Sequence, residues 1–275
     1  MPATDKDAIV GEVREKYGRI AKGGGGCGCG PSSCGGSAEA PVSLGIGYRK
    51  DDIEALPDGA DLGLGCGAPL AHLALRPGET VLDLGSGGGI DAFLAAREVG
   101  PGGRVIGVDM TPEMVERARA NARRTGLSHV EFREGRLESL PVADASVDAV
   151  TSNCVINLVP DKARVFAEVA RVLKPGGRLV ISDVVLDGRL PERVEEDVYA
   201  YVGCVAGAAL REDYFGRLRE AGLGEAEVLK DVDYLAGLRA TAPDQAEALL
   251  ERTGVRWEEV AGKVRSITFR ARKAS

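Results

Sequence analysis

Val81-Leu82-Asp83-Leu84-Gly85-Ser86-Gly87-Gly88-Gly89-Ile90-Asp91 is the stretch that decides the fold of this chain. Apolar residues that flank an aspartate run directly into glycines, a pattern typical of a buried strand that ends in a tight turn before a helix. Glycines in such a turn let the backbone approach a bound group closely, and the first amides of the next helix point into the same space. The stretch therefore predicts a ligand site at the end of a strand.

The spacing of the glycines indicates which ligand binds there. The dinucleotide fingerprint requires glycine at its first, third and sixth positions, but the sixth residue counted from Gly85 is Ile90. The pattern Asp-x-Gly-x-Gly-x-Gly, from Asp83 to Gly89, suits a ligand with an ammonium group and a ribose. It resembles the first motif of S-adenosylmethionine-dependent methyltransferases of the Rossmann-like class. Taken alone, the turn is equally consistent with a purely structural connection.

Length and composition limit the class of protein. A chain of 275 residues can form one domain of roughly 150 to 200 residues with additions. A net charge of −7, without a basic cluster interleaved with aromatic residues, argues against a nucleic-acid partner. No apolar run approaches the roughly 18 residues that cross a bilayer, and residues 1–17 lack a signal-peptide core. We therefore expect a cytoplasmic protein without a membrane partner.

Strand and helix patterns alternate through the middle of the chain. Helices are expected at Ile90–Val99, Thr111–Thr125 and Lys162–Leu173, and strands at Thr80–Leu84, Arg104–Asp109, His129–Arg133, Val147–Ser152 and Arg178–Leu186. Lys174–Gly177 is expected to stop a helix and turn the chain. The alternation predicts an α/β fold with a doubly wound, mainly parallel sheet and helices on both faces. The resemblance of the glycine turn implies that this is a Rossmann-like methyltransferase sheet. Ligands of such sheets bind at the carboxyl ends of the strands.

The two ends of the chain have a different character. Asp5–Ile20 predicts a charged helix, and the Gly- and Cys-rich residues 22–37 after it predict a loop that is mobile or ordered by a ligand. After Asp187, an interrupted helix at Pro191–Leu210 and a helix at Arg211–Ala221 begin an α+β extension that is expected to cover the cleft. Its strands, at Val228–Tyr234 and Ser266–Arg272, are candidates to complete the sheet. Helical material is expected at Gln245–Arg252 and Trp257–Val264. We therefore expect an N-terminal segment (1–60), a cofactor-binding core (61–187) and a C-terminal region (188–275).

Asp109 strengthens the prediction of a cofactor site. It ends the second expected strand, 24 residues after Gly85, where an acid can accept hydrogen bonds from both ribose hydroxyls. The alternative is that it only precedes the helix that Thr111 and Pro112 begin. Repetition of a strand, a glycine turn and an acid at this interval favours ligand binding. The candidate cofactor contacts are Asp83, Gly85, Ser86, Gly87, Asp109, Met110, Arg136, Leu137 and Asn153.

The six cysteines, at positions 27, 29, 34, 66, 154 and 204, do not form a disulfide scaffold pattern for a cytosolic chain. Two histidines and no C-x-x-C pair give little support to a zinc site or a histidine base. Cys154 follows a strand end, and Cys66 and Cys204 lie in segments that could fold over those ends. A lone cysteine is more often a small buried apolar residue. Three such placements around one cleft favour a shared thiol site.

Five segments together resemble the arsenite methyltransferases: Leu62-Gly63-Leu64-Gly65-Cys66-Gly67, Val81-Leu82-Asp83-Leu84-Gly85-Ser86-Gly87, Val108-Asp109-Met110-Thr111-Pro112-Glu113-Met114, Ser152-Asn153-Cys154-Val155-Ile156-Asn157-Leu158 and Gly203-Cys204-Val205-Ala206-Gly207-Ala208. The resemblance covers roughly residues 8–210. Its specific part is the cysteine-bearing segments, because the glycine and acid motifs are shared with other methyltransferases, including those of quinone biosynthesis.

The resemblance implies that Cys66, Cys154 and Cys204 bind arsenic(III), with an N-terminal cysteine as the redox partner of Cys66. Cys27, Cys29 and Cys34 are the candidates, and we select Cys34 because it is nearest to Cys66 in the sequence. It also implies S-adenosylmethionine as methyl donor, S-adenosylhomocysteine as product, and arsenite or an arsenic-thiol conjugate as substrate, in arsenic detoxification. Glutathione or thioredoxin would be the reductant, and we expect a monomer. Two positions depart from the pattern. Ala68 replaces the usual asparagine, and Arg136 stands where related enzymes place an acid near the adenine, which leaves the Leu137 backbone as an alternative contact.

Two alternative functions remain open at this stage. The first is a small-molecule C-, O- or N-methyltransferase whose cysteines are structural. The second is a non-catalytic protein that binds arsenic or a soft metal and retains an inactive cofactor site. Trivalent arsenic is thiophilic, so three thiolates in one cleft favour methylation of arsenic over the first alternative. Against the second, the cofactor residues Asp83, Gly85, Gly87 and Asp109 are intact.

Overall fold

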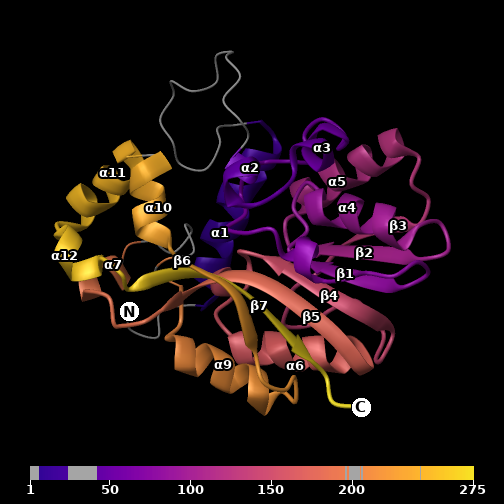
Figure 1. The fold of residues 1–275 in the computed structure, drawn as a ribbon. Helices are drawn as coiled ribbons and strands as arrows, with labels where there is room; N and C mark the ends of the chain where they lie inside the picture. The colour runs from indigo at the N-terminus through magenta and orange to yellow at the C-terminus, as the bar shows by residue number, and fades with distance from the viewer. Residues whose placement is uncertain (1–5, 24–41, 196, 198–204, 206, 242) are drawn as a thin grey trace.

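A seven-stranded sheet forms the centre of the computed structural model, which describes residues 6–23, 42–195, 197, 205, 207–241 and 243–275 (Figure 1). The strand order is β3-β2-β1-β4-β5-β7-β6. Strands β1 to β5 are parallel, whereas β7 runs antiparallel to both of its neighbours, β5 and β6. The strands are Thr80–Leu84 (β1), Arg104–Asp109 (β2), Val130–Glu134 (β3), Val147–Asn153 (β4), Leu173–Leu186 (β5), Glu227–Asp233 (β6) and Val264–Arg272 (β7).

The strand order creates a crevice between β1 and β4. From β1 the chain proceeds outward to β3 on one side, and it then returns to β4 and proceeds outward on the other side. The connections at the carboxyl ends of β1 and β4 therefore diverge, and ligands of open α/β sheets bind at such a point. The predicted doubly wound, mainly parallel sheet with helices on both faces is confirmed.

Alternation along the strands builds two cores. In β1, Leu82 and Leu84 face the core formed with α6 (Lys162–Val172) and α9 (Arg211–Glu220). Val81 faces the opposite core, formed with α4 (Ile90–Val99) and α5 (Pro112–Thr125). Since both faces of β1 are covered, its side chains from Val81 to Leu84 are buried, which explains the nearly continuous apolar run in the sequence.

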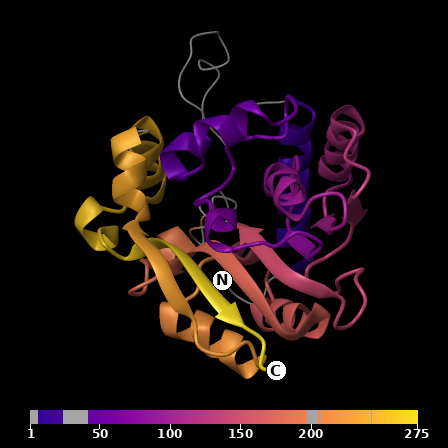
Figure 2. The same ribbon diagram turned by 45° about the vertical axis from the view of Figure 1, so that its right-hand side comes forward.

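The remaining helices surround this framework. Figure 2 shows α10, α11 and α12 gathered at the side of the molecule opposite to α4 and α5. Helix α1 packs against α5 and brings the N-terminal part of the chain to the core. These elements are α1 (Lys6–Ala21), α2 (Val42–Ile46), α3 (Lys50–Glu54), α7 (Glu192–Glu195), α10 (Tyr234–Thr241), α11 (Pro243–Thr253) and α12 (Trp257–Val260), with short 3₁₀ helices η1 (Pro69–His72) and η2 (Ile156–Leu158).

The predicted turn at Lys174–Gly177 is wrong, because these residues lie within β5. Leu173 pairs with Val147, but the next pairing joins Arg178 to Ala149, so an irregularity in the strand accommodates the intervening residues. Gly176 adopts a left-handed φ of 72° within this irregularity. Helix α6 ends at Val172, so the predicted helix stop is confirmed, and the Pro-Gly-Gly signal marks a bulge-like distortion of the strand that follows.

Of the interrupted helix predicted at Pro191–Leu210, the structure describes a first part, α7, and Leu210 forms a parallel bridge with Leu186. Much of the stretch between them lies outside the described residues. Helix α12 ends at Val260, because β7 begins at Val264. The three-part division at residues 60 and 187 remains a prediction. Among the described helices, none combines the length and apolar character needed to cross a membrane.

Candidate functional site

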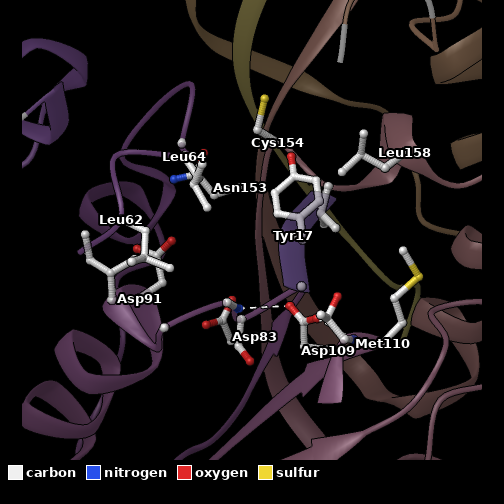
Figure 3. A pocket seen from close by; sticks show the side chains of 18 of the residues that line it. Tyr17, Leu62, Leu64, Asp83, Asp91, Asp109, Met110, Asn153, Cys154 and Leu158 are labelled. Carbon is white, nitrogen blue, oxygen red and sulfur yellow. Dashed lines mark hydrogen bonds between the residues drawn. The ribbon is translucent and has the colours of Figure 1, made fainter. Parts of the chain in front are cut away.

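A pocket opens at the carboxyl ends of β1, β2 and β4, where the strand order predicts a ligand site (Figure 3). Strand β1 and its turn form the floor. Helix α1 and the loop before η1 form other parts of the wall. The residues that line it are Val13, Tyr17, Ser43, Tyr48, Ala60, Asp61, Leu62, Leu64, Gly65, Asp83, Gly85, Ser86, Gly87, Gly88, Ile90, Asp91, Asp109, Met110, Thr111, Leu137, Glu138, Asn153, Cys154, Val155, Leu158 and Val159.

The glycine turn after β1 requires residues without a side chain. Gly85 and Gly87 adopt left-handed φ angles of 63° and 51°, a region that other residues rarely enter. The backbone N–H groups of Gly85 and Ser86 donate to the Val108 carbonyl at 2.8 and 3.1 Å. A Cβ atom on Gly85 would overlap the side chain of Val155. The turn is therefore fixed against both β2 and the segment that follows β4.

Asp109 ends β2 and faces the same pocket. Its carboxylate accepts hydrogen bonds from the backbone N–H of Gly87 at 3.0 Å and of Thr111 at 2.9 Å. Burial raises the pKa of Asp109, and these two amide donors oppose the shift. The acid is thus held rigidly at the strand end, in the position that accepts ribose hydroxyls in this class of fold.

Asp83 carries an uncompensated oxygen. Its side chain is 3% exposed, and its Oδ2 atom has no hydrogen-bond partner among the described residues. Burial, followed by the charges of Asp91 and Asp109, raises its pKa well above the ordinary value. An unpaired carboxyl group in a buried site is costly, and a positively charged or hydrogen-bonding ligand would relieve that cost. The pocket therefore fits a ligand that carries an ammonium group and a ribose.

A third buried acid, Asp91, lies in the first turn of helix α4. The hydroxyl of Tyr48 donates to its Oδ1 atom at 2.9 Å. Burial raises the pKa of Asp91 to about 6, while hydrogen bonds from Tyr48 and the Asn153 side chain act in the opposite direction. Three acids in one pocket give it a strongly negative potential when they are ionised, which suits a cationic ligand.

Cys154 lies on the wall of this pocket, next to Asn153 (Figure 3). It adopts a φ of 58°, which is a strained conformation for a residue with a side chain. Its backbone N–H donates to the Ser182 carbonyl of β5 at 2.8 Å, so the unusual conformation is held by the neighbouring strand. Backbone strain of this kind is concentrated at functional sites.

Cys66 does not line the pocket, but its neighbour Gly65 does. Cys66 and Cys154 are both 8% exposed and belong to the same buried cluster. The backbone of Cys66 is held on two sides. Its N–H donates to Asn153 Oδ1 at 3.0 Å, and its carbonyl accepts from Ser266 Oγ at 2.9 Å.

Buried hydrogen bonds between Asn157 and β5 hold the segment that follows Cys154. Asn157 Nδ2 donates to Asp183 Oδ1 at 2.9 Å and to the Val184 carbonyl at 2.5 Å. Asp183 Oδ2 accepts from the Tyr214 hydroxyl at 3.0 Å. Burial raises the pKa of Asp183 to about 6, and the hydrogen bonds from the Val184 amide and Tyr214 oppose this shift.

Most of the sequence-predicted contacts lie together in the pocket: Asp83, Gly85, Ser86, Gly87, Asp109, Met110, Leu137, Asn153 and Cys154. Arg136 is absent from this lining, and its guanidinium pairs with Glu138 at 2.8 Å. Cys34 and Cys204, like Cys27 and Cys29, lie outside the described residues. The site assignments for these cysteines remain predictions.

Several pocket residues were not predicted from the sequence, and Val13, Tyr17, Tyr48 and Asp91 are examples. Val13 and Tyr17 come from α1, and Tyr48 from the connection between α2 and α3. Their partners lie far away in the chain, so no local motif indicates them. Asp91 follows the glycine turn directly, and its position at the start of α4 was the available signal.

The fold, the glycine turn and the acids define the class of Rossmann-like methyltransferases. A family model described as a methyltransferase domain matches residues 75–236, and the chain therefore belongs to this family. Its sheet carries the crevice and the acids described above. The match includes β1 to β6 and excludes Cys66, so the family alone does not specify the methyl acceptor.

More specific relatives are arsenite methyltransferases. The chain is 52% identical over 225 residues to one from Halobacterium salinarum, covering 78% of this chain and 57% of the relative. It is 44% identical over 174 residues to one from Aquipseudomonas alcaligenes, covering 61% of this chain and 50% of the relative. The chain thus spans about half the length of these curated relatives.

A solved structure agrees with these matches. An arsenic(III) S-adenosylmethionine methyltransferase from Chlamydomonas reinhardtii superposes with a TM-score of 0.62 at 33% identity, covering 86% of this chain and 75% of that one. The resemblance to arsenite methyltransferases predicted from the sequence is confirmed.

Proposed function

We propose that this protein transfers methyl groups from S-adenosylmethionine to trivalent arsenic bound by cysteine thiolates. One observation carries the proposal: Cys154 lines the pocket that contains the glycine turn and the acids. The names of the relatives support arsenic as the methyl acceptor. Cys66 supports the proposal further, because its backbone N–H is hydrogen-bonded to the side chain of Asn153, the residue before Cys154.

The acids of the pocket have proposed roles in binding the methyl donor. When bound, S-adenosylmethionine supplies an electrophilic methyl group on a positively charged sulfur. Asp109 is placed to accept hydrogen bonds from a ribose, and Asp83 Oδ2 can accept from an ammonium group. The glycine turn allows close approach of the backbone, and Leu137 lies on the pocket wall as the alternative adenine contact.

The acceptor side uses thiol chemistry. Thiolates are the ligands that soft ions prefer, so Cys66 and Cys154 would hold arsenic(III), with Cys204 as the third proposed ligand. Arsenic bound by three sulfurs keeps a lone pair, so the thiolates present a nucleophile without a general base. This agrees with a pocket lining that contains no histidine among the described residues. Orientation by a rigid site can supply about 7–11 kcal/mol of the barrier reduction.

The reaction also requires a reductant. The new As–C bond uses the arsenic lone pair, which makes arsenic formally pentavalent, and two electrons return it to the trivalent state. Two thiolates supply these electrons when they close a disulfide, and an external thiol then reduces that disulfide. We propose Cys34 and Cys66 as this pair and glutathione or thioredoxin as the external reductant. We further propose that the protein is cytoplasmic and monomeric and that it acts in arsenic detoxification.

The test is an assay with the whole chain, arsenite, S-adenosylmethionine and glutathione, followed by chromatographic separation and detection of arsenic. Methylated arsenic and S-adenosylhomocysteine are expected together. Cys154→Ser should abolish methylation while retaining S-adenosylmethionine binding. A wild-type protein that binds both ligands and forms no methylated arsenic would contradict the proposal. Full turnover of another acceptor by Cys154→Ser would favour a small-molecule methyltransferase with structural cysteines.

A further inference from the structure

The side chain of Asn153 holds the loop that carries Cys66. Asn153 is the last residue of β4 and directly precedes Cys154. Its Oδ1 atom accepts from the Cys66 N–H at 3.0 Å, and its Nδ2 atom donates to the Gly67 carbonyl at 2.7 Å. Nδ2 also donates to the Tyr48 hydroxyl at 2.9 Å. One carboxamide therefore satisfies a donor and an acceptor on the two sides of Cys66.

We propose that Asn153 is a positioning residue that sets the separation of the Cys66 and Cys154 thiols, in addition to lining the cofactor pocket. The inference rests on the proposed function, since it concerns the binding of trivalent arsenic by these thiols. Cys154 follows Asn153 in the chain, and Cys66 is hydrogen-bonded to its side chain. A single residue thus links two thiol-bearing segments that are 88 positions apart.

The glycines on either side of Cys66 show how closely this loop packs against Asn153 and β5. A Cβ atom on Gly65 would lie 2.7 Å from Asn153 Nδ2, and one on Gly67 would lie 2.5 Å from Ser182 Oγ. Neither distance is sterically possible unless the loop or the side chain that it meets is displaced. Gly65 and Gly67 therefore allow Asn153 and β5 to approach the Cys66 backbone.

Ser182 of β5 provides a common reference for both thiol segments. Its carbonyl accepts from the Cys154 N–H at 2.8 Å. Its hydroxyl shares a 2.8 Å hydrogen bond with Thr268 and occupies the space next to Gly67. The two segments are therefore fixed to one strand as well as to each other, so the loop has little freedom to change the thiol separation.

Tyr48 extends this arrangement to the cofactor pocket. Its hydroxyl accepts from Asn153 Nδ2 and donates to Asp91 Oδ1, both at 2.9 Å. Asp91 lies on the wall of the cofactor pocket. Asp91, Tyr48, Asn153 and the Cys66 loop thus form a continuous hydrogen-bonded chain that fixes the thiol site relative to the donor site.

The chemistry of the amide is specific. An aspartate at position 153 could accept from the Cys66 N–H but could not donate to the Gly67 carbonyl. Alanine would lose all three contacts. We therefore expect both Asn153→Asp and Asn153→Ala to weaken the attachment of the Cys66 loop, because each loses the hydrogen bond to the Gly67 carbonyl.

The test compares binding of phenylarsine oxide, a trivalent arsenical that bridges two thiols, with binding of S-adenosylmethionine, both by isothermal titration calorimetry. Asn153→Ala should raise the dissociation constant of phenylarsine oxide about tenfold or more, the effect of a hydrogen-bond contribution of about 1.4 kcal/mol. The dissociation constant of S-adenosylmethionine should change several-fold less. In steady-state assays, KM for arsenite should rise more than KM for the cofactor.

A double-mutant cycle separates positioning from general damage to the fold. In a Cys66→Ser background, Asn153→Ala should have almost no further effect on phenylarsine oxide affinity, because the thiol that it positions is gone. Effects that add in full would overturn the proposal, and so would a larger loss for S-adenosylmethionine than for the arsenical.

Gly65→Ala provides a second route if Asn153→Ala does not fold. It should displace the loop from Asn153 and weaken phenylarsine oxide binding in the same way. Gly102→Ala is its matched control, because a Cβ there would meet nothing within 4 Å. Equal affinities for the two glycine variants would contradict the inference. A wild-type protein that binds phenylarsine oxide but does not methylate arsenite would refute the proposed function alone.

Discussion

The Tyr214 hydroxyl donates a 3.0 Å hydrogen bond to Asp183, and both side chains are completely buried. Burial, then Asp183, and then the thiols of Cys66 and Cys154 raise the pKa of Tyr214 well above its ordinary value. The hydroxyl therefore remains protonated and available as a donor. Through Asn157, this pair supports the turn that follows Cys154.

The first prediction concerns this pair. Tyr214→Phe preserves the ring contacts with Phe166 and Phe269 but leaves one Asp183 oxygen without its donor. We expect the free energy of unfolding, measured with urea, to fall by about 1–3 kcal/mol. Adding Asp183→Asn to Tyr214→Phe should recover part of the loss by removing the buried charge. Unchanged stability of Tyr214→Phe would show that the hydrogen bond contributes little.

The second prediction concerns pH. Burial raises the pKa of Asp91 to about 6, whereas an unfolded aspartate titrates near 4. Between these values the folded state binds more protons than the unfolded state, so this group's contribution to stability falls as pH rises from about 4 to about 6.

Asp91→Asn removes this contribution. Because other acids also titrate, the informative quantity is the difference in unfolding free energy between wild type and Asp91→Asn at pH 4 and pH 7. Relative to the variant, wild type should lose stability on the order of 2–3 kcal/mol across this window. A flat difference between wild type and Asp91→Asn would contradict the expected shift.

The third prediction concerns Asp109. Asp109→Ala removes the proposed ribose acceptor and also the partner of the Gly87 and Thr111 amides. Loss of hydrogen bonds to a charged group should raise the dissociation constant of S-adenosylhomocysteine by about 10- to 100-fold in calorimetry. Phenylarsine oxide affinity should change much less, since Asp109 has no role on the thiol side. Equal losses for both ligands would indicate collapse of the pocket instead.

The fourth prediction compares two left-handed glycines. Gly85 and Gly126 have φ angles of 63° and 68°, so alanine at either costs about 1–2 kcal/mol of backbone strain. Only at Gly85 would the new Cβ overlap Val155, the neighbour of Cys154, whereas at Gly126 it meets nothing within 4 Å. Gly85→Ala should lose measurable cofactor binding, while Gly126→Ala loses stability alone. Intact cofactor binding by a folded Gly85→Ala would contradict the proposed role of the turn.

The sheet could be predicted from the sequence because its information is local. In β1, burial on both faces gives an apolar run, and the following glycines mark the turn by their backbone angles. Asp109 was identifiable because the interval from the glycine turn is a property of the βαβ unit. The distortion at Lys174–Gly177 was not predictable, since the same residues can end a helix or bend a strand.

The polar network of the site could not be predicted, because its partners are distant in the sequence. Tyr48 contacts Asn153 across 105 positions and Asp91 across 43. Nothing in the residues around Tyr48 distinguishes it from a tyrosine on the surface. Such partners become neighbours only after the sheet has formed and the N-terminal segments have packed onto it.

Formation of the thiol site is also tied to the order in which the chain is made. Ser266 of β7 anchors the Cys66 carbonyl, although the two residues are 200 positions apart. During synthesis on a ribosome, the cofactor-binding strands β1 to β5 emerge long before β7, which inserts between β5 and β6. The Cys66 loop therefore lacks one of its anchors until nearly the whole chain has been made, because that anchor comes from the last strand of the sheet.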